Sequence, residues 1–147
     1  MPVVKFHLVD GVSTPVQDAQ LLSSATQLYC EVLQAPIERV RAFITPHAPG
    51  RFAVAGQLVA DGAPHAPVFD FIVLEGRPLD QRQRLMAGFT DLLVDILGVR
   101  RELIRGSCRR VEPEDWCIGG QPASVLRADE VRARAEQAQR PDIQPAR

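Results

Sequence analysis

The chain repeats one phrase, and this repeat limits its fold more than any other feature does. Residues 1–12 read MPVVKFHLVDGV, and residues 66–77 read APVFDFIVLEGR. The agreement continues after a one-residue slip, with identical pairs at Leu21/Leu85, Leu28/Leu92, Leu33/Leu97, Arg41/Arg105, Gly56/Gly120 and Gln57/Gln121. Self-similarity of this extent predicts that the chain consists of two copies of one supersecondary unit.

Each copy contains the same order of predicted elements. A β-branched and apolar run predicts a strand, an apolar stripe at helical spacing predicts a helix, and a further short run predicts a second strand. Ser13-Thr14-Pro15 is a helix-start signal, and Gly98 is expected to end the second helix. The expected strands are 3–9, 39–45, 68–74 and 102–108, with helical stripes at 21–33 and 85–97 and short hairpins or turns at 51–58 and 112–121.

These elements predict an α+β fold built from tandem β-α-β units. Parallel strands that are joined by a right-handed crossover give each half two strands with a helix on one face. The two halves are expected to pair into one four-stranded sheet with two helices on one face. The other face is expected to be rich in Val, Ile and Phe, and therefore to be buried against partner chains.

The chain is expected to divide at a short linker. We predict a first half at 2–60, a linker rich in Pro and Gly at 61–66, a second half at 67–124, and a C-terminal helix and tail at 125–147. The helix is predicted near 125–138. The polar stretch from 139 to 147 is predicted to be disordered.

Composition argues against several classes of protein. A chain of 147 residues can bury a core without disulfides or metals as staples. The net charge is −1, so no basic field predicts a nucleic-acid partner, and no apolar run approaches the ~20 residues that span a bilayer. The three cysteines and three histidines have no metal-ligand spacing. We therefore expect a cytoplasmic protein without a metal site, whose histidines are hydrogen-bonded or solvated.

The order and spacing of several motifs resemble the tautomerase superfamily. These motifs are Pro2 after the initiator Met, HLVDG and VLEGR after the first strands, VRAFIT and LIRGSC near the second strands, and RFAVAGQL and DWCIGGQ in the terminal turns. Each half resembles the short subunit of 4-oxalocrotonate tautomerase. The resemblance implies the tautomerase fold in a fused chain. It also implies a homotrimer, in which three double-length chains replace the family's hexamer of short chains.

The resemblance implies that Pro2 is catalytic. In the family the initiator Met is removed, and the proline nitrogen becomes a free secondary amine that shuttles protons. An α-amine has a reference pKa of about 7.7–8, and burial beside arginines is expected to lower the pKa toward neutrality. A general base works best there. Pro67 follows Ala66 in a peptide bond, so its nitrogen is an amide, and each chain has one competent amine.

The resemblance also implies two arginines and an aromatic wall in the site. In the second half these positions hold Arg77 and Arg105, which would act in substrate binding and catalysis, and Trp116, which would bind substrate. The planar fork of arginine suits a carboxylate, and an aromatic ring would exclude water. Packing alone is the alternative for Trp116. We expect Pro2 to meet these three residues.

The equivalent positions of the first half hold Val12, Arg41 and Phe52. Together with Pro67 they are expected to form a degenerate second site, because Val12 replaces an arginine and the nitrogen of Pro67 is blocked. Arg41 and Phe52 are therefore secondary candidates, and an interface or core role is the competing interpretation for both.

The function that we expect is keto–enol tautomerisation of 2-hydroxy-dienoate or enolpyruvate-type acids, with low and promiscuous activity. The partner is a small carboxylate or keto acid, and no cofactor or membrane is implied. A superfamily decarboxylase or hydratase-dehalogenase of a small three-carbon acid is an alternative. Glu38 favours the former, whereas Leu74 and Ile118 stand where related dehalogenases carry an arginine and a water-activating glutamate. A trimeric scaffold that has lost its chemistry is a further alternative.

Overall fold

The structure, a computed structural model, describes residues 2–140 and contains two β-α-β units in tandem. The first unit is β1 (Val3–Val9), α1 (Pro15–Leu33) and β2 (Arg41–His47). The second unit is β5 (Val68–Leu74), α2 (Leu79–Leu97) and β6 (Arg105–Val111). A short hairpin follows each unit, β3 (Ala53–Val54) with β4 (Gln57–Leu58) and β7 (Cys117–Ile118) with β8 (Gln121–Pro122).

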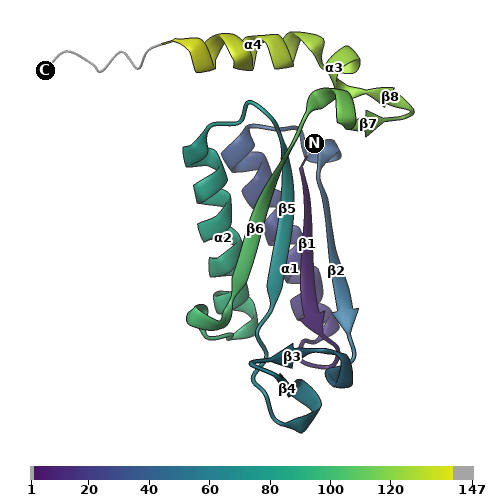
Figure 1. Cartoon of the computed structure of the whole chain (residues 1–147), viewed down its shortest axis with the longest axis vertical. Coiled ribbons are helices and arrows are strands. Elements are labelled where there is room, and N and C mark those ends of the chain that lie inside the picture. The colour runs from purple at the N-terminus through teal and green to yellow at the C-terminus, as the bar shows by residue number, and fades with distance from the viewer. Residues whose placement is uncertain (1, 141–147) are drawn as a thin grey trace, which may run out of the picture.

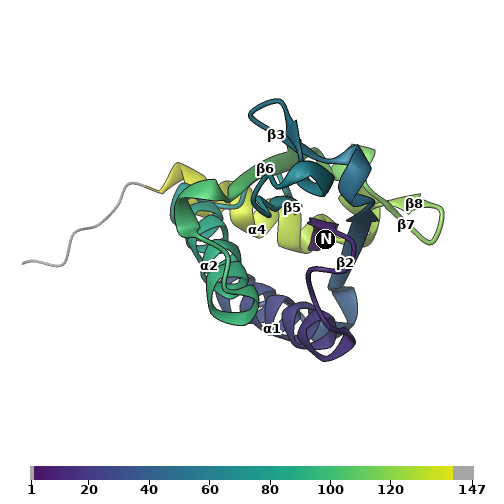
Figure 2. The ribbon, with the colours of Figure 1, turned by 90° about the horizontal axis from the view of Figure 1, so that it is seen from below.

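The four long strands form one sheet in the order β2-β1-β5-β6. The strands within each unit are parallel, and the two units meet through the antiparallel pair of β1 and β5. Helices α1 and α2 lie side by side on one face of this sheet (Figures 1 and 2). The predicted fold class is therefore confirmed. Because the central pairing is antiparallel, the two units begin at opposite ends of the sheet.

The hydrophobic core lies between the helices and the face of the sheet that they cover. Alternate residues of the central strands point into it, and its largest aromatic members meet around Phe89. The ring of Phe89 packs edge-on against Phe6, Phe69 and Phe71, with centroid distances of 5.9, 5.7 and 5.1 Å. Edge-to-face contacts of this kind add to the stabilisation that burial provides.

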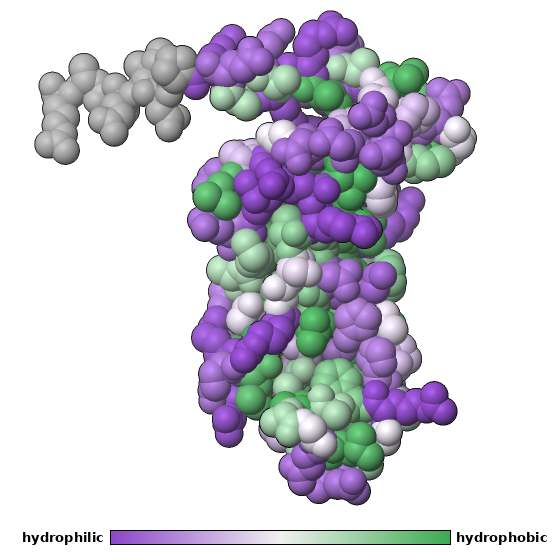
Figure 3. All heavy atoms as spheres, in the orientation of Figure 1, coloured by the Kyte–Doolittle hydropathy of each residue, from purple (hydrophilic) through white to green (hydrophobic). Residues whose placement is uncertain are grey.

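The open face of the sheet is more polar than the sequence analysis predicted. Strand alternation places Lys5, His7, Asp70, Ser107 and Arg109 on it, among Val3, Phe43, Val68 and Ile72. The expectation of a face rich in Val, Ile and Phe was wrong, because alternation directs most of those residues toward the helices. Figure 3 shows hydrophilic and hydrophobic residues mixed over the side of the molecule that Figure 1 presents.

Polar groups on this face are paired with one another. The ring of His7 lies 2.9 Å from the ring nitrogen of His47 and 3.0 Å from the carboxylate of Asp70. His65 accepts a hydrogen bond from the backbone N–H of Val9 at 3.3 Å. The three histidines are thus hydrogen-bonded, as predicted. Among residues 2–140, no group of three or more His, Cys, Asp or Glu side chains is placed to hold a metal ion.

The second strand of each unit begins later than predicted. A single 3-10 turn precedes each one, η1 (Ile37–Arg39) before β2 and η4 (Arg101–Leu103) before β6. The remaining 3-10 turns are η2 (Pro49–Arg51), η3 (Val59–Asp61) and η5 (Pro113–Asp115). The turns η1 and η4 contain apolar residues that also fit the alternating pattern of a strand. The observed starts of β2 and β6 therefore lie two and three residues after the predicted ones.

The helix-start and helix-stop signals act as predicted. Thr14 and Gln17 form a capping box, in which each side chain accepts a hydrogen bond from the backbone N–H of the other residue, and Pro15 lies in the first turn. Gly98 ends α2 in the left-handed conformation, with φ of 68°.

The predicted C-terminal helix is present as two pieces, α3 (Ala123–Leu126) and α4 (Ala128–Gln139). Helix α4 lies across the end of the sheet at which the chain begins (Figure 1). The predicted disordered stretch, apart from Gln139 and Arg140, lies outside the described residues. Within 2–140, no helix combines the length and the apolar character that crossing a membrane requires.

Candidate active site

The two ends of the sheet hold different sets of the predicted site residues. The backbone N–H of Arg41 donates to the carbonyl oxygen of Pro2 at 2.9 Å, and that of Arg105 donates to Pro67 at 3.2 Å. Parallel strands of one unit begin at the same end, so Arg41 starts level with Pro2 and Arg105 level with Pro67. We expected Arg105 to meet Pro2, but within one chain the two residues lie at opposite ends of the sheet. Arg41 lies at the Pro2 end instead.

Arg105 lies on the exposed edge strand β6. Its Nη1 donates to two carbonyl oxygens just before it in the chain, at 2.8 and 3.0 Å. Arg41 makes the matching pair of hydrogen bonds on the opposite edge strand, β2, at 2.8 and 3.1 Å. Both residues thus lie on the edge strands of the four-stranded sheet.

Pro2 is buried at the start of β1, and a helix residue holds that strand in place. The hydroxyl of Tyr29 on α1 lies 2.9 Å from the carbonyl oxygen of Val3 and 3.1 Å from that of Ile72. Burial raises the pKa of Tyr29 well above its ordinary value, so the hydroxyl stays a donor. This contact ties the start of β1 to the end of β5, which leads to Arg77.

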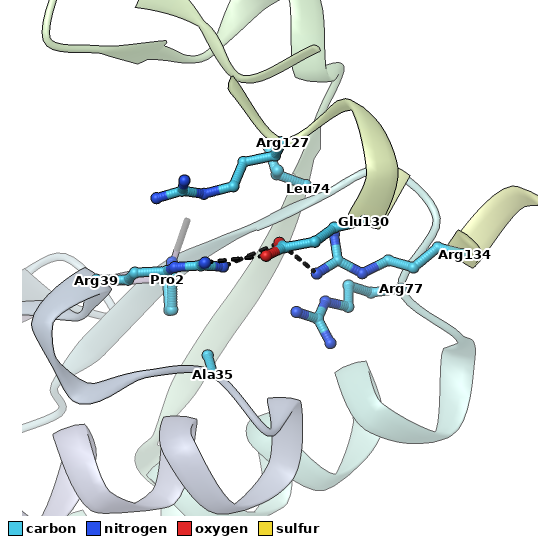
Figure 4. A pocket seen from close by; sticks show the side chains of 8 residues that line it. All are labelled: Pro2, Ala35, Arg39, Leu74, Arg77, Arg127, Glu130 and Arg134. Carbon is cyan, nitrogen blue, oxygen red and sulfur yellow. Dashed lines mark hydrogen bonds and ion pairs between the residues drawn. The ribbon is translucent and has the colours of Figure 1, made fainter. Parts of the chain in front are cut away.

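A small cavity opens beside Pro2. Figure 4 shows its lining, which consists of Pro2, Ala35, Arg39, Leu74, Arg77, Arg127, Glu130 and Arg134. The cavity holds about 20 Å³, which is room for about one water molecule. Two of the predicted residues, Pro2 and Arg77, therefore share one site, and four arginines face a single carboxylate in it.

The carboxylate of Glu130 is held by arginines on two elements. Arg39 donates to both of its oxygens, with both N–O distances at 2.9 Å, and Arg134 lies 3.7 Å away. The hydrogen bonds from Arg39 hold the pKa of Glu130 below its ordinary value. A bidentate pair of this kind is the geometry by which arginine binds a carboxylate ligand.

Arg77 occupies the inner side of this cluster. Its Nη1 donates to the carbonyl oxygen of Leu33 at the end of α1, at 2.8 Å. Burial, together with the positive charge of Arg134, lowers the pKa of Arg77 to about 10. Arg77 is therefore protonated near neutral pH and adds a positive charge beside Pro2.

Trp116 lies at the Pro2 end, in the turn before the second hairpin. It lines a neighbouring hollow together with Val3, Arg39 and Arg41. Its indole Nε1 is buried without a hydrogen-bond partner among residues 2–140. Arg39 lines both this hollow and the Pro2 cavity, so the two spaces adjoin at this residue.

The residues expected to form the degenerate second site lie at the opposite end, except for Arg41. The ring of Phe52 packs against His47 at the end of β2, with centroids 5.8 Å apart. Val12 is 42% exposed in the turn after β1, and the carbonyl oxygen of Pro67 accepts from Arg105. The arginines at the start of β6 and in the turn before it, Arg100, Arg101 and Arg105, are exposed at this end.

Comparison with known proteins assigns the family. A family model described as "Tautomerase enzyme" matches the chain twice, over residues 2–62 and 67–125. The chain belongs to the tautomerase family. The 2-hydroxymuconate tautomerase of Pseudomonas putida is 32% identical over 60 residues, which are 41% of this chain and 94% of that protein.

Solved structures of tautomerases agree with the duplicated architecture. Native fused 4-OT is 28% identical with a TM-score of 0.79, and the match covers 84% of this chain and 98% of that chain. The F6 fused 4-OT, described as an asymmetric trimer, is 24% identical with a TM-score of 0.76 and the same coverage. These likenesses confirm the tautomerase fold of the tandem units.

Four residues of the Pro2 cavity were missed by the sequence analysis: Arg39, Arg127, Glu130 and Arg134. Three of them come from the C-terminal segment, which extends beyond both family matches. Glu130 and Arg134 are four residues apart, and this spacing predicts that both lie on the same side of the C-terminal helix. Nothing local indicated that this side would face Pro2.

Proposed function

We propose that the protein is a keto–enol tautomerase that acts on 2-hydroxy-dienoate or enolpyruvate-type acids, with the nitrogen of Pro2 as general base and acid after removal of Met1. The observation that carries the proposal is the placement of Pro2 and Arg77 in one cavity of a tautomerase-family chain. The 2-hydroxymuconate tautomerase relative supports this substrate class.

In the proposed reaction, the free amine of Pro2 accepts the proton of the enol hydroxyl. The electrons of the broken O–H bond form the C=O bond of the ketone, and the alkene electrons form a new C–H bond with the proton that the prolinium returns. The buried position and the neighbouring arginines disfavour a charged amine and so favour the base form at neutral pH. Arg77 supplies positive charge for the substrate carboxylate and for the developing enolate. The scheme requires no cofactor.

Arg105 enters the proposed site only from a second chain, because its own chain places it at the Pro67 end. We propose a homotrimer in which the edge strands meet, so that Arg105 of one chain approaches the Pro2 cavity of a neighbour. The F6 fused 4-OT trimer supports this assembly. Trp116 lies near the cavity and serves as the apolar wall. Three free cysteines, Cys30, Cys108 and Cys117, are compatible with the proposed cytoplasmic location.

The alternative chemistries have less support. The side chain of Glu38, which favoured a decarboxylase, is exposed and does not line the Pro2 cavity. Leu74 lines the cavity where a dehalogenase of this layout carries an arginine. Of the three reactions, tautomerisation therefore requires the fewest catalytic side chains that the Pro2 cavity lacks.

The test is a matched pair of proline variants. Pro2→Ala is expected to lower kcat/KM for phenylenolpyruvate or 2-hydroxymuconate by at least about 100-fold, since it replaces the ring-held secondary amine with a mobile primary amine that is a poorer general base. Pro67→Ala is expected to retain activity, because an amide nitrogen takes no part in proton transfer. Mass spectrometry of the active protein should show that Met1 is absent. Retained Met1 in active protein, or full turnover by Pro2→Ala, would exclude the mechanism, and no turnover by the wild type on either substrate would favour the scaffold interpretation.

A further inference from the structure

Helix α4 lies outside both family matches, yet it forms one wall of the Pro2 cavity. The family model ends at residue 125, and α4 begins at Ala128. From this helix Glu130 and Arg134 point toward Arg39 and Arg77, and Arg127 points in from just before it (Figure 4). The C-terminal segment therefore contributes charged residues to the site that the tandem units build.

Glu130 has the contacts of a bound carboxylate ligand. Both of its oxygens accept from the fork of Arg39 at 2.9 Å, and Arg134 stands 3.7 Å away on the same helix. With Glu130 in place, the cavity beside Pro2 holds about 20 Å³. That volume accepts a water molecule but not the carboxylate of an organic acid.

The arginines in this cavity exceed what Glu130 can neutralise. Arg39, Arg77, Arg127 and Arg134 face one carboxylate. The Nε of Arg127 is buried without a partner among the described residues. Four cations and an unused donor around one anion form a site with affinity for further negative charge.

A larger hollow lies on the outer side of Glu130. It is lined in part by Ala35, Arg39, Arg77, Glu130 and Arg134, and it holds about 390 Å³. Glu130 thus lines both this hollow and the inner cavity beside Pro2. An acid that approaches through the hollow meets Glu130 and Arg39 before it reaches Pro2.

We infer that Arg39 and the arginines of the C-terminal segment form a carboxylate-binding site beside Pro2, and that Glu130 occupies this site as an internal ligand which an incoming acid must displace. The consequence of this displacement for catalysis rests on the proposed function, whereas the binding of a carboxylate at the site does not. A tethered carboxylate competes at a high effective concentration, so it weakens binding of free carboxylates without any change in the site itself.

The test measures binding of glutarate, a carboxylate that cannot tautomerise, to the full-length chain by isothermal titration calorimetry at fixed ionic strength. Glu130→Gln is expected to bind glutarate about tenfold more tightly than the wild type, because the internal competitor loses its charge. Glu136→Gln is the matched control. It makes the same change on an exposed side chain of α4 that lines neither space, so its affinity should equal that of the wild type.

A further variant tests the assignment of Arg39. Adding Arg39→Gln to Glu130→Gln should abolish the gain in glutarate affinity. If this double variant does not fold, Arg39→Lys is used in place of Arg39→Gln. Equal affinities of Glu130→Gln and the wild type would overturn the inference. The same gain in Glu136→Gln, or a gain that survives loss of Arg39, would overturn it as well. Because the readout is binding, tighter glutarate binding without tautomerase turnover would refute the proposed function alone.

Discussion

The charge of Glu130 depends on the guanidinium group that it faces. Arg39 and Glu130 pair through two hydrogen bonds, while Arg134 and Arg127 add positive charge around the same carboxylate. Each interaction with an arginine favours the ionised form of Glu130. The partial burial of the side chain acts in the opposite direction and raises its pKa, but this effect is smaller than that of the hydrogen bonds from Arg39. The attachment of α4 to the tandem units is therefore coupled to the protonation of this one residue.

This coupling predicts that α4 detaches in acid. The pKa of Glu130 is lower in the docked helix than in a free one, so the stabilisation is fully present above the ordinary value of about 4.3 and is lost as pH falls through the lowered pKa. Hydrogen–deuterium exchange of residues 128–139, corrected for the intrinsic rate, should show protection that is constant from about pH 7 to 5 and falls below about pH 4. Glu130→Gln should lack this step, and a step of equal size in that variant would assign it to other acids.

At the level of elements, the two β-α-β units fill one equivalent position of the core with side chains of different size. The second unit has a larger residue on its first strand and a smaller one on its second strand. In the first unit Val4 of β1 stands opposite Ala42 of β2, and in the second unit Phe69 of β5 stands opposite Gly106 of β6. The larger ring of Phe69 covers the glycine, and a Cβ added at Gly106 would lie 2.1 Å from that ring. The second unit thus accommodates a buried aromatic residue because its edge strand lacks a side chain there.

This pairing predicts that Gly106→Ala destabilises the fold. The added methyl group forces the buried ring of Phe69 to move within a close-packed core, at a cost of about 1–3 kcal/mol. A fall in Tm of several degrees is expected in thermal unfolding followed by circular dichroism. Gly50→Ala, where a Cβ meets nothing within 4 Å, is the control. Gly106→Ala should cost less in a Phe69→Val background, and equal costs in both backgrounds would contradict the stated contact.

At the level of the whole molecule, duplication has produced one chain with two unlike ends. The Pro2 end combines Arg41 of the first unit with Arg77 and Trp116 of the second. The other end holds Arg105 beside a proline whose nitrogen is an amide. Since Arg105 cannot reach Pro2 within its own chain, its predicted role requires assembly.

Mixing of inactive variants tests this division between chains. Pro2→Ala and Arg105→Ala are each expected to abolish most activity. When the two are denatured together, mixed in equal amounts and refolded as trimers, about a quarter of the sites should regain both residues from different chains. Pro2→Ala mixed with Arg77→Ala should recover nothing, because those residues share one cavity of one chain. Full activity of Arg105→Ala alone, or no recovery in the first mixture, would show that Arg105 does not complete a neighbour's site.

Local patterns were sufficient to predict the elements. The repeated phrase, the capping signals around Thr14 and the stop at Gly98 act over a few residues, and the structure confirms the tandem units that they indicate. The resemblance also predicted that Pro2 and Arg77 belong together, and the cavity contains both. The elements depend on short-range chemistry that each copy carries in its own sequence, whereas the meeting of Pro2 and Arg77 depends on the pairing of β1 with β5.

The sequence by itself determined the two copies, their order of strands and helices, and the single free proline nitrogen that the chain can offer. Only the tertiary structure decided which ends of the copies coincide, because the antiparallel pairing of β1 with β5 has no local signal and it separates Arg105 from Pro2. The docking of α4 was likewise decided in three dimensions. Arg39 and Glu130 are 91 residues apart, and their pairing depends on the path that brings the last helix back over the start of the chain.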